Sequence, residues 1–468
     1  MDCDISNNFN PYFDMINSRK SKIVAKLADN KSEVPFLKAL FETGADVAWL
    51  NTAHQDEAAT VGVVERIRSI STTMPIFLDT KGPEIRTKGL ETPLEVKAGD
   101  NVIFTGDPTY TGPNVVLVTY PNFHNEVPVG KSVLYDDASM ELVVEEKLEK
   151  GIRCVVKNGG LIKKKKSLNI PDVHIKLSAL SDKDIGFVHY CAKNNIDFII
   201  HSFVRNKQDI FDIKDILKAY PDYKGKILSK IENREGFDNT REILEHSYGL
   251  MVARGDLGAE VPLEELPYMQ KKMIETALEM GKHCIVATQV LDSMIKNPRP
   301  TRAEVSDTAN AVLDGTDAIS MSGETAYGDY PLEATSIMGR IMSYTEDRRE
   351  ELVHFTAKPK IATPAYAYAE KVVAEAGAKK AKAIIVMSKD LEISRAISAY
   401  RPSCVVVPVC TTEWDVRELA IRYALRPIYS PSFDKNTALK EVAAMKKNGG
   451  VIVVTETGKD AWTHEIIA

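Results

Sequence analysis

Short runs rich in β-branched residues alternate with amphipathic helical stretches from residue 21 onward. Each run is continuously apolar at its start, which is typical of a strand buried on both faces, and most end in polar or charged residues. Eight strands joined by helices in this way predict an α/β fold built on a closed (β/α)8 TIM barrel. The eight runs are KIVAKLA (22–28), VAWLNTA (47–53), IFLDTK (76–81), FIIHSF (198–203), KILSKIE (226–232), GLMVARGDL (249–257), HCIVATQ (283–289) and AISMSGET (318–325).

The regular spacing is broken once and resumes in a second unit. Alternating strands with Gly and Pro turns separate IFLDTK from FIIHSF, which predicts a small β-barrel domain inserted into one βα loop. After about residue 345 a further α/β unit follows, with strands at AKAIIVMS, CVVVPVC and GVIVVTE. We expect an N-terminal extension (1–20), the barrel (21–87 and 171–345), the insert acting as a lid (88–170) and a C-terminal α/β domain (346–468).

Two helices carry a recognisable start signal. Thr301 followed by Glu304 fits a capping box that opens a helix running to about Leu313. Ser181 with Asp184 fits the same role for the helix that precedes FIIHSF. Both signals place a helix between consecutive strands of the predicted barrel.

Composition and charge narrow the kind of ligand that the chain can attract. The 468 residues are 44% apolar and 27% charged, which is ordinary for a globular protein. Sixty Lys and Arg against 66 Asp and Glu give a net charge of −6, so no overall field recruits nucleic acid or an anionic membrane. A local cluster must therefore hold any anionic substrate. Six scattered cysteines without a C-x-x-C pair, and a polar, acidic start, predict a cytoplasmic protein with reduced thiols.

Polar side chains gather where the predicted strands end, which is where barrel enzymes place their chemistry. Glu232 and Asp256, on adjacent strands, could reach one hard divalent cation, and Lys230 faces the same side as Glu232. Such a set suits a phosphate or carboxylate whose charge shifts during reaction. The alternative is that these ions pair off as salt bridges. The full set is Asn51, His54, Asp79, Lys81, Arg86, Ser202, Arg205, Lys230, Glu232, Arg254, Asp256, Thr288, Gln289, Ser322 and Glu324.

Five long motifs carry most of these residues in order. They are LDTKGPEIR (78–86), SKIENREG (229–236), MVARGDLGAEVP (251–262), ATQVLDSMIKNPRPTRAE (287–304) and AVLDGTDAISMSGETAYGDYPLEA (311–334). Together they resemble the pyruvate kinase family. The resemblance implies a homotetrameric glycolytic enzyme that transfers the phosphoryl group of phosphoenolpyruvate to ADP and protonates the enolate to pyruvate.

The resemblance also implies a role for individual residues. Glu232 and Asp256 would bind Mg²⁺ or Mn²⁺, Lys230 would neutralise the phosphoryl group, and Arg86 would contact it. Thr288 and the backbone around Ala253, Gly255 and Asp256 would hold the substrate carboxylate. Asn51, Asp79 and the Thr80 carbonyl match potassium ligands, and Glu84 matches a position associated with potassium dependence. Asn51, His54 and Arg86 would face the nucleotide, although His54 could equally be a structural histidine.

The second strand departs from the family pattern, in which an Arg contacts the transferring phosphate and a Ser supplies a potassium ligand. Here Trp49 replaces the Arg and Ala53 replaces the Ser. Loss of a phosphate-binding Arg removes transition-state stabilisation, and Ala53 should weaken the potassium site. The missing charge could be recovered from Lys26 or from the run Lys163–Lys166, which is either a solvated loop or a patch attracting substrate under the lid. The end of the first strand and the residues after it also depart from the family pattern. The family has I-G-P-A-S near the adenine, whereas this chain has Leu27–Lys31 there.

The C-terminal unit departs as well. Activated relatives bind a sugar phosphate with a Ser/Thr/Gly-rich turn, whereas MSKDLEISRA (387–396) places Asp390 and Glu392 there. Activation by fructose bisphosphate is therefore not expected.

Three functions stay open on the sequence. The first is an active pyruvate kinase, and the second is an impaired relative that binds phosphoenolpyruvate as a sensor or regulatory subunit. The third is a metal-dependent, enolate-forming lyase on the same barrel. The metal residues alone cannot separate the first from the third, because both would stabilise an enolate.

Overall fold

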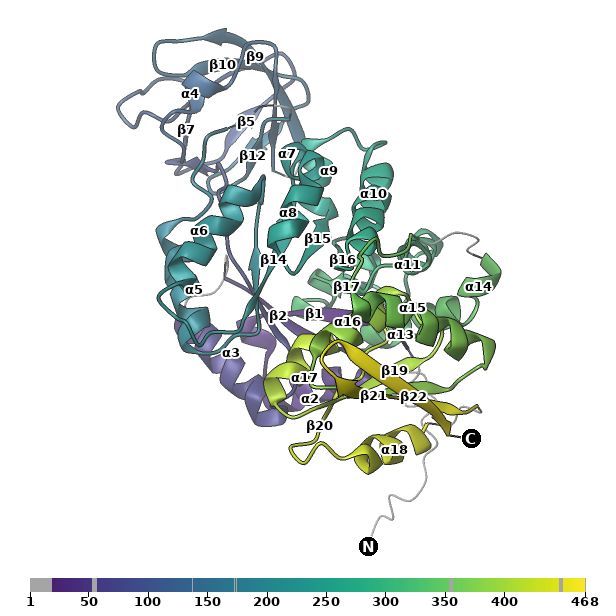
Figure 1. Cartoon of the computed structure of the whole chain (residues 1–468). Coiled ribbons are helices and arrows are strands. Elements are labelled where there is room, and N and C mark those ends of the chain that lie inside the picture. Colours follow the sequence, from purple (N-terminus) through teal and green to yellow (C-terminus); the bar gives the residue numbers. More distant parts are fainter. Residues whose placement is uncertain are drawn as a thin grey trace, which may run out of the picture.

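The structure is a computed structural model, and it describes residues 19–52, 57–136, 138–171, 173, 175–352, 357–445 and 449–467. Eight parallel strands close into a barrel in the order β1-β17-β16-β15-β14-β13-β3-β2, which confirms the predicted TIM barrel (Figure 1). The strands are β1 (Lys22–Leu27), β2 (Val47–Asn51), β3 (Ile76–Asp79), β13 (Phe198–His201), β14 (Lys226–Ile231), β15 (Gly249–Ala253), β16 (His283–Ala287) and β17 (Ala318–Met321).

Every barrel strand ends earlier than its sequence run predicts. One of the two largest corrections concerns 249–257, which is a strand only to Ala253, because α9 (Arg254–Glu260) begins at the next residue. The run 318–325 likewise ends as a strand at Met321, and α12 (Gly323–Ala326) follows. Beyond the rim of the barrel a strand has no neighbour to pair with, so the polar ends of the runs form loops and helix starts instead. Those polar residues are therefore collected at one end of the barrel.

Helices surround the barrel, and both predicted capping boxes are confirmed. Thr301 caps α11 together with Glu304, and Gly315 ends that helix in a left-handed conformation, with φ 96°. Ser181 and Asp184 form the second capping box, at α5. The elements around the barrel are η1 (Asp29–Lys31), α2 (Val34–Thr43), α3 (Glu57–Ile70), α5 (Asp182–Lys193), α6 (Lys207–Leu217), α7 (Arg234–Asp238), α8 (Thr240–His246), α10 (Leu266–Glu279), η2 (Asp292–Ile295), α11 (Arg302–Asp314), α13 (Pro331–Asp347) and α14 (Arg349–Leu352).

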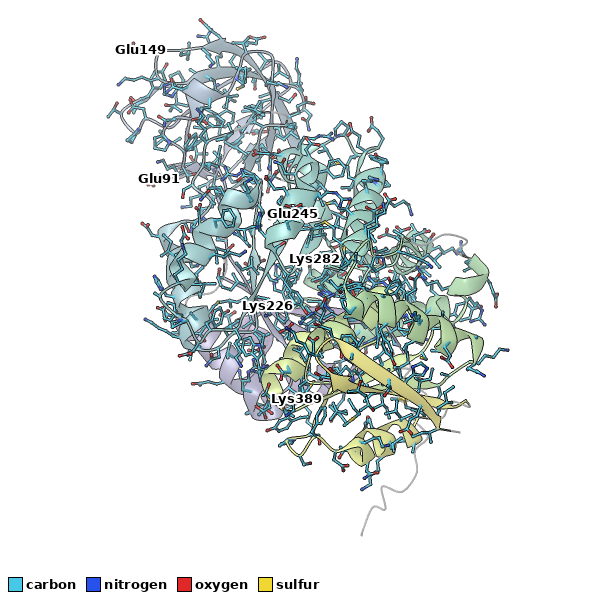
Figure 2. The ribbon with its side chains drawn as sticks, in the orientation of Figure 1. Glu91, Glu149, Lys226, Glu245, Lys282 and Lys389 are labelled. Atoms are coloured by element: carbon cyan, nitrogen blue, oxygen red, sulfur yellow. The ribbon has the colours of Figure 1, made fainter. Side chains whose placement is uncertain are left out.

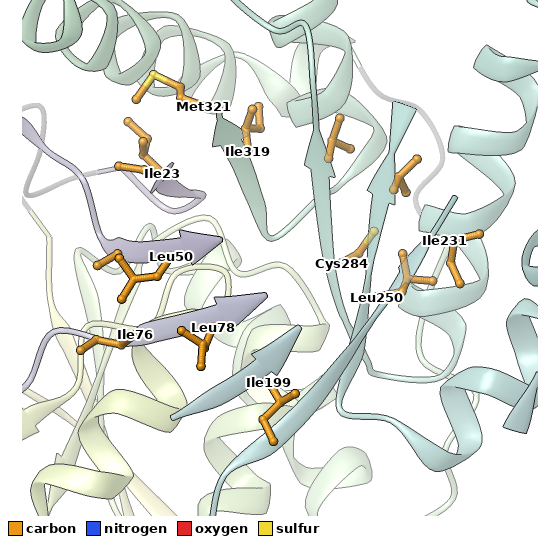
Figure 3. Close-up of a cluster of buried hydrophobic side chains, with 14 of the residues drawn as sticks. Ile23, Leu50, Ile76, Leu78, Ile199, Ile231, Leu250, Cys284, Ile319 and Met321 are labelled. Atoms are coloured by element: carbon orange, nitrogen blue, oxygen red, sulfur yellow. The ribbon is translucent and has the colours of Figure 1, made fainter. Parts of the chain in front are cut away.

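Alternate residues of the barrel strands belong to two different cores. Figure 3 shows one of them, in which Ile23, Leu50 and Ile319 belong to the cluster that packs the strands against the helices. The residues next to them, such as Val24 and Trp49, face the barrel interior and pack with Phe77 and Ile285. Trp49 is only 4% exposed and lies opposite Phe77 in the register of β2 and β3. The indole is thus part of the packed barrel interior.

The chain between β3 and β13 forms a separate β structure around its own apolar core. Its strands make a seven-stranded mixed sheet in the order β12-β8-β9-β10-β6-β7-β4 and a two-stranded sheet, β11-β5. In Figure 1 it stands at the far end of the molecule from the C-terminal part. The elements are β4 (Thr87–Lys88), β5 (Leu94–Val96), β6 (Asn101–Thr105), β7 (Val115–Val118), α4 (Phe123–Glu126), β8 (Ser132–Tyr135), β9 (Met140–Lys147), β10 (Ile152–Val156), β11 (Gly160–Ile162) and β12 (Leu168–Asn169).

The C-terminal part contains a five-stranded sheet in the order β20-β19-β18-β21-β22. The predicted strand GVIVVTE corresponds to β21, and the residues beyond it, which were not predicted as a strand, form β22 and pair antiparallel with β21 in a hairpin. Glu456 of this hairpin accepts hydrogen bonds from the Ser388 hydroxyl, at 2.8 Å, and from the Lys389 amide, at 3.0 Å. The elements are α15 (Pro364–Ala378), β18 (Ala383–Met387), α16 (Leu391–Ala399), β19 (Val405–Cys410), α17 (Glu413–Ala420), β20 (Ile428–Tyr429), α18 (Lys435–Ala443), β21 (Val451–Gly458) and β22 (Ala461–Ile467).

Buried ion pairs join the base of the barrel to the C-terminal part. Arg401 donates to both carboxylate oxygens of Asp317, at 3.1 and 3.0 Å, and the Tyr423 amide donates to the same carboxylate at 3.0 Å. Asp197 binds Arg417 at 2.6 Å and Arg68 at 2.7 Å. Among the helices that the structure describes, none combines the length and apolar character needed to span a membrane.

Candidate active site

Lys230 lies at the centre of the polar cluster on the barrel rim. Its ammonium nitrogen Nζ is 2.9 Å from Glu232 Oε1 and 3.4 Å from Asp79 Oδ2, and it donates to Ser202 Oγ at 3.2 Å. Burial lowers the pKa of Lys230, but the carboxylates of Asp79, Glu232 and Asp256 outweigh this effect and raise it above the ordinary value. Lys230 is therefore a fixed, buried cation at the carboxyl end of β14.

Asp79, Thr80 and Ser202 form a compact set of oxygens beside Lys230. The Ser202 hydroxyl lies 2.9 Å from Asp79 Oδ1 and 2.8 Å from the Thr80 carbonyl. The Thr52 hydroxyl donates to the Asp79 carbonyl at 2.7 Å, which fixes the end of β2 against β3. Asn51 lies opposite Asp79 in the same register. The structure thus brings together the three residues that were matched to a monovalent cation, while Ala53 and His54 lie outside the described residues.

Glu232 and Asp256 form a pair of neighbouring carboxyl groups. The Phe203 amide donates to Glu232 Oε2 at 2.7 Å, and Oε1 lies 2.9 Å from the Lys230 ammonium. Burial raises the pKa of Glu232 to about 8; the Lys230 charge opposes this shift, and the Asp256 carboxyl adds to it. Two acids held together in a buried place fit a hard cation that takes oxygen ligands. Within the described chain, no three His, Cys, Asp or Glu residues gather as a complete metal site, so such a cation would need substrate or water oxygens as well.

Thr288, which directly follows β16, lies next to Gly255 in the first turn of α9. Thr288 has φ 75°, a left-handed backbone that is strained for a β-branched residue. Arg254 holds this turn by donating to the Thr288 carbonyl at 2.6 Å, and Arg254 itself pairs with Asp307 at 2.7 Å. A Cβ on Gly255 would approach Thr288 Cγ2 to 2.8 Å, so only glycine permits this contact. The loop beside Asp256 is therefore held in one geometry.

Arg86 lies at the junction between the barrel and the insert. Its guanidinium binds Glu84 through two nitrogens, with the shortest contact at 2.7 Å, and donates to the Lys165 carbonyl at 2.7 Å. The charge of Arg86 is thus already engaged by Glu84. A cavity of about 550 Å³ opens at the same junction and is lined by Glu84, Phe203 and Glu260 among others.

Glu324 has a structural place on the rim. Its two oxygens accept from the Leu291 amide at 3.0 Å and from the Ser322 amide at 2.8 Å. Both carboxylate oxygens are therefore occupied in ordering the loops after β16 and β17.

Lys26 is a further cation on this rim, and its Nζ lies over the Trp49 ring, 4.9 Å from the ring centroid. Lys26 alternates along β1 with Ala25 and Leu27, which pack outward, and so it faces inward like Val24. Burial lowers the pKa of Lys26, and the Asp79 carboxylate opposes that shift. Period-two alternation along KIVAKLA is the sequence signal that could have placed this lysine in the site.

A closed barrel with a buried Lys, paired carboxyl groups and a strained Thr on its carboxyl rim defines an enzyme that acts on an anionic substrate. Residues 18–335 match the family model described as pyruvate kinase, barrel domain. The chain belongs to the pyruvate kinase family.

Named relatives agree with this assignment. The pyruvate kinase of Borreliella burgdorferi is 44% identical over 420 residues, covering 90% of this chain and 87% of that protein. The pyruvate kinase of Geobacillus stearothermophilus is 37% identical over 453 residues, covering 93% of this chain and 77% of the relative. The crystal structure of a pyruvate kinase from Cryptosporidium parvum superposes with a TM-score of 0.89 at 33% identity, covering 97% of each chain.

Proposed function

We propose that this chain transfers the phosphoryl group of phosphoenolpyruvate to ADP and releases pyruvate and ATP. The observation that carries the proposal is the Lys230 ammonium, held 2.9 Å from Glu232 at the carboxyl end of a barrel strand in a member of this family. An ADP oxygen attacks the phosphorus, the bond from phosphorus to the enol oxygen breaks, and the electron pair remains on the enolate. The methylene carbon then takes up a proton to give pyruvate.

Each rim group has a part in this reaction. Lys230 neutralises the phosphoryl group while its charge is displaced, as a fixed cation does in phosphoryl transfer. Glu232 and Asp256 would hold Mg²⁺ or Mn²⁺, which when bound supplies a Lewis acid for the substrate oxygens. The backbone of Ala253, Gly255 and Asp256 positions the carboxylate, and Thr288 lies beside the carbon that is protonated. Arg86 would have to leave Glu84 to reach the phosphate, which closure of the insert as a lid could bring about.

A monovalent cation fits beside this site. Asp79 and the Thr80 carbonyl already share the Ser202 hydroxyl, and Asn51 lies across from Asp79, so these oxygens could surround K⁺. Replacement of a hydroxyl by Ala53 would make that site weaker. The homotetramer, the cytoplasmic location and a nucleotide contact by Asn51, His54 and Arg86 stay predictions.

The test is a coupled assay of pyruvate formation from phosphoenolpyruvate and ADP with Mg²⁺ or Mn²⁺. We expect turnover that requires both substrates and the divalent ion. Pyruvate formed without ADP would instead indicate the lyase, and binding of phosphoenolpyruvate without turnover would indicate a sensor.

A further inference from the structure

Lys26 stands apart from the other charged groups of the rim. Within the described part of the chain, its ammonium makes no hydrogen bond and no ion pair, and its nearest recorded partner is the face of the Trp49 indole. Lys230, by contrast, has two carboxylates within 3.4 Å. A partly buried cation without a directly paired anion is costly unless a ligand supplies the negative charge at contact distance.

We propose that Lys26 is a catalytic residue, whose ammonium contacts the phosphoryl group of the substrate and stabilises it during transfer. This inference rests on the proposed function and assigns the same site a second fixed cation. Lys26 reaches the site from β1, whereas Lys230 reaches it from β14 and the remaining acids come from β3, β14 and α9. The two lysines would then hold one phosphoryl group from different sides of the barrel.

The position of Trp49 explains how the Lys26 ammonium can stay available to a phosphoryl group. Lys26 and Trp49 are paired in the register of β1 and β2, and the indole is packed in the barrel interior. An ammonium over an indole face is attracted to the ring, and this attraction positions the ammonium without neutralising its charge. A carboxylate partner would have to be displaced before phosphate could bind. The Trp49 ring needs no such displacement. The ammonium can therefore turn from the indole face to a phosphoryl dianion, and this change of partner is favourable.

The first experiment replaces Lys26 by methionine, which keeps the length of the side chain and removes its charge. We expect kcat/KM for phosphoenolpyruvate to fall about 10²- to 10³-fold, the loss typical of one phosphoryl-stabilising cation. The inhibition constant of oxalate, a planar dianion shaped like the enolate but lacking a phosphoryl group, should change less than about twofold by the same argument. If oxalate binding falls in parallel, Lys26 acts only through the structure of the site.

The matched control is Lys214→Met. Lys214 also lies over an aromatic ring, 5.6 Å from the Phe211 centroid, but both residues belong to α6, outside the rim cluster. We expect it to leave kcat/KM unchanged. Equal losses for both variants, or no loss for Lys26→Met, would overturn the proposal. If the parent protein itself shows no turnover, the proposed function fails, and that outcome is distinct from either of these.

A double-mutant cycle that moves the positive charge from position 26 to position 49 sharpens the same test. Trp49→Arg in the parent places a second cation beside Lys26, so we expect no gain in rate. The double variant Lys26→Met with Trp49→Arg should have a kcat/KM at least about tenfold higher than Lys26→Met alone, because it returns one cation to the same side of the site. Additive losses from the two changes would overturn the assignment.

A second, independent observation lies at the base of the barrel. A cavity of about 380 Å³ opens where the barrel meets α16 and α17, and four cations line it: Lys226, Lys282, Arg395 and Arg422. Figure 2 labels Lys226 and Lys282 at this junction. Glu418 binds both Lys226, at 3.4 Å, and Arg395, at 2.8 Å. The other acid in the lining, Glu392, accepts from the Thr363 hydroxyl at 3.0 Å.

Lys282 and Arg422 therefore face the cavity without a carboxylate among the described residues at ion-pair distance. Lys282 donates to the Ser247 carbonyl at 2.9 Å, and Arg422 donates to the Tyr248 hydroxyl and the Gly281 carbonyl, both at 3.0 Å. Burial, together with Arg422 and other nearby cations, lowers the pKa of Lys282 to about 8. This excess positive charge between two parts of the chain is what a bound oxyanion would relieve.

We infer that this cavity binds a phosphate-class anion between the barrel and the C-terminal part. The probes are inorganic phosphate, a small phosphate ester such as glycerol phosphate, and sulfate, each followed by the thermal unfolding midpoint. We expect stabilisation by phosphate or its ester that Lys282→Met removes and Lys230→Met keeps, since the latter disables only the rim site. Lys271→Met, which changes an exposed lysine paired with Asp314, is the matched control.

The outcomes separate the sources of the ligand. Stronger stabilisation by the ester than by phosphate indicates a phosphorylated metabolite, and the reverse indicates free phosphate. Equal, weak stabilisation by sulfate and phosphate that Lys282→Met does not change means an adventitious ion only, and it overturns the inference. Arg395→Met provides a second variant should Lys282→Met not fold.

Discussion

The two ends of the barrel both bury charged groups, yet they treat them differently. At the base, the Asp317 carboxylate accepts four hydrogen bonds, two from the Arg401 guanidinium and one each from the Tyr423 and Cys284 amides. At the rim, the Lys26 ammonium makes no hydrogen bond and no ion pair within the described residues, and it lies over an indole face. Burial is similar at both ends, so it does not distinguish them. The difference lies in whether the protein itself completes the partners of each charge.

This difference separates stability from function in physical terms. A buried charge with complete partners is costly to disturb, because removing one partner strands the other. A buried charge with an incomplete set of partners costs folding energy and gains it back when a ligand binds. We therefore expect substitutions at the rim to change rates, and substitutions at the base to change the free energy of unfolding.

The largest expected effect is that of Lys230→Met on catalysis. Removal of the central cation should lower kcat by about 10³-fold or more, because it acts where charge is displaced in the transition state. The coupled pyruvate assay measures this loss, and urea unfolding measures separately the stability lost when Asp79 and Glu232 lose their shared cation. Lys271→Met, on the exposed surface, is the control and should keep full activity. Retained turnover in Lys230→Met would contradict the expectation that rim substitutions change the rate.

Asp317→Asn tests the base of the barrel. The change breaks the charged pair with Arg401 and leaves that guanidinium buried, so we expect a loss of about 3–5 kcal/mol in the free energy of unfolding. Urea unfolding measures the shift, and kcat at 25 °C should stay within about twofold because no rim group moves. Lys271→Met removes an ion pair with Asp314 in which the lysine itself is exposed, and it should cost far less. A large fall in kcat without a loss of stability would contradict the comparison.

The base and the rim of the barrel differ in how far the sequence predicts them. The eight strands and both capping boxes follow from local patterns, and the structure confirms them. The rim residues were predictable because strand ends of a barrel always meet on one side. The pair between Asp317 and Arg401 was not predictable, since it depends on how two parts of the chain dock and no local pattern encodes that contact.

Trp49 shows the limit of comparing positions one by one. Its substitution for Arg predicted a missing charge, and the structure places the indole inside the barrel with Lys26 above it. The ion pair of Glu84 with Arg86 could have been foreseen, because two residues separated by one position on an extended chain share a face. The hairpin of β21 and β22 was missed because its second strand, Ala461–Ile467, mixes exposed polar and apolar residues.

Acid stability offers a smaller test at a histidine between the two ends. His201 on β13 is fully buried, neither ring nitrogen has a hydrogen-bond partner among the described residues, and burial lowers its pKa to about 4. The unfolded chain binds a proton near pH 6.5 that the folded chain refuses, so stability should fall as the pH drops from about 6.5 to 4. The total should be about 2–3 kcal/mol.

Urea unfolding at pH 7 and at pH 5 measures this slope for the parent and for His201→Leu. We expect the leucine variant to lose less stability on acidification, because it has no proton to gain. His464→Gln changes an exposed histidine and should keep the slope of the parent. An identical slope in His201→Leu would mean that other groups govern the acid response.

The smallest expected effect concerns the lysine run at the edge of the insert. Lys163, Lys164 and Lys165 are exposed, whereas Lys166 pairs with Asp136 at 2.8 Å. Exposed lysines can only attract an anionic substrate through a field that salt screens over about 10 Å at 0.1 M. Replacing these three by glutamine should raise KM for phosphoenolpyruvate about two- to threefold at low salt and leave kcat unchanged. The increase should vanish at about 0.3 M salt, whereas the loss in Lys26→Met should persist, because a partly buried contact is screened much less. An unchanged KM at low salt would show that the run is only a solvated loop.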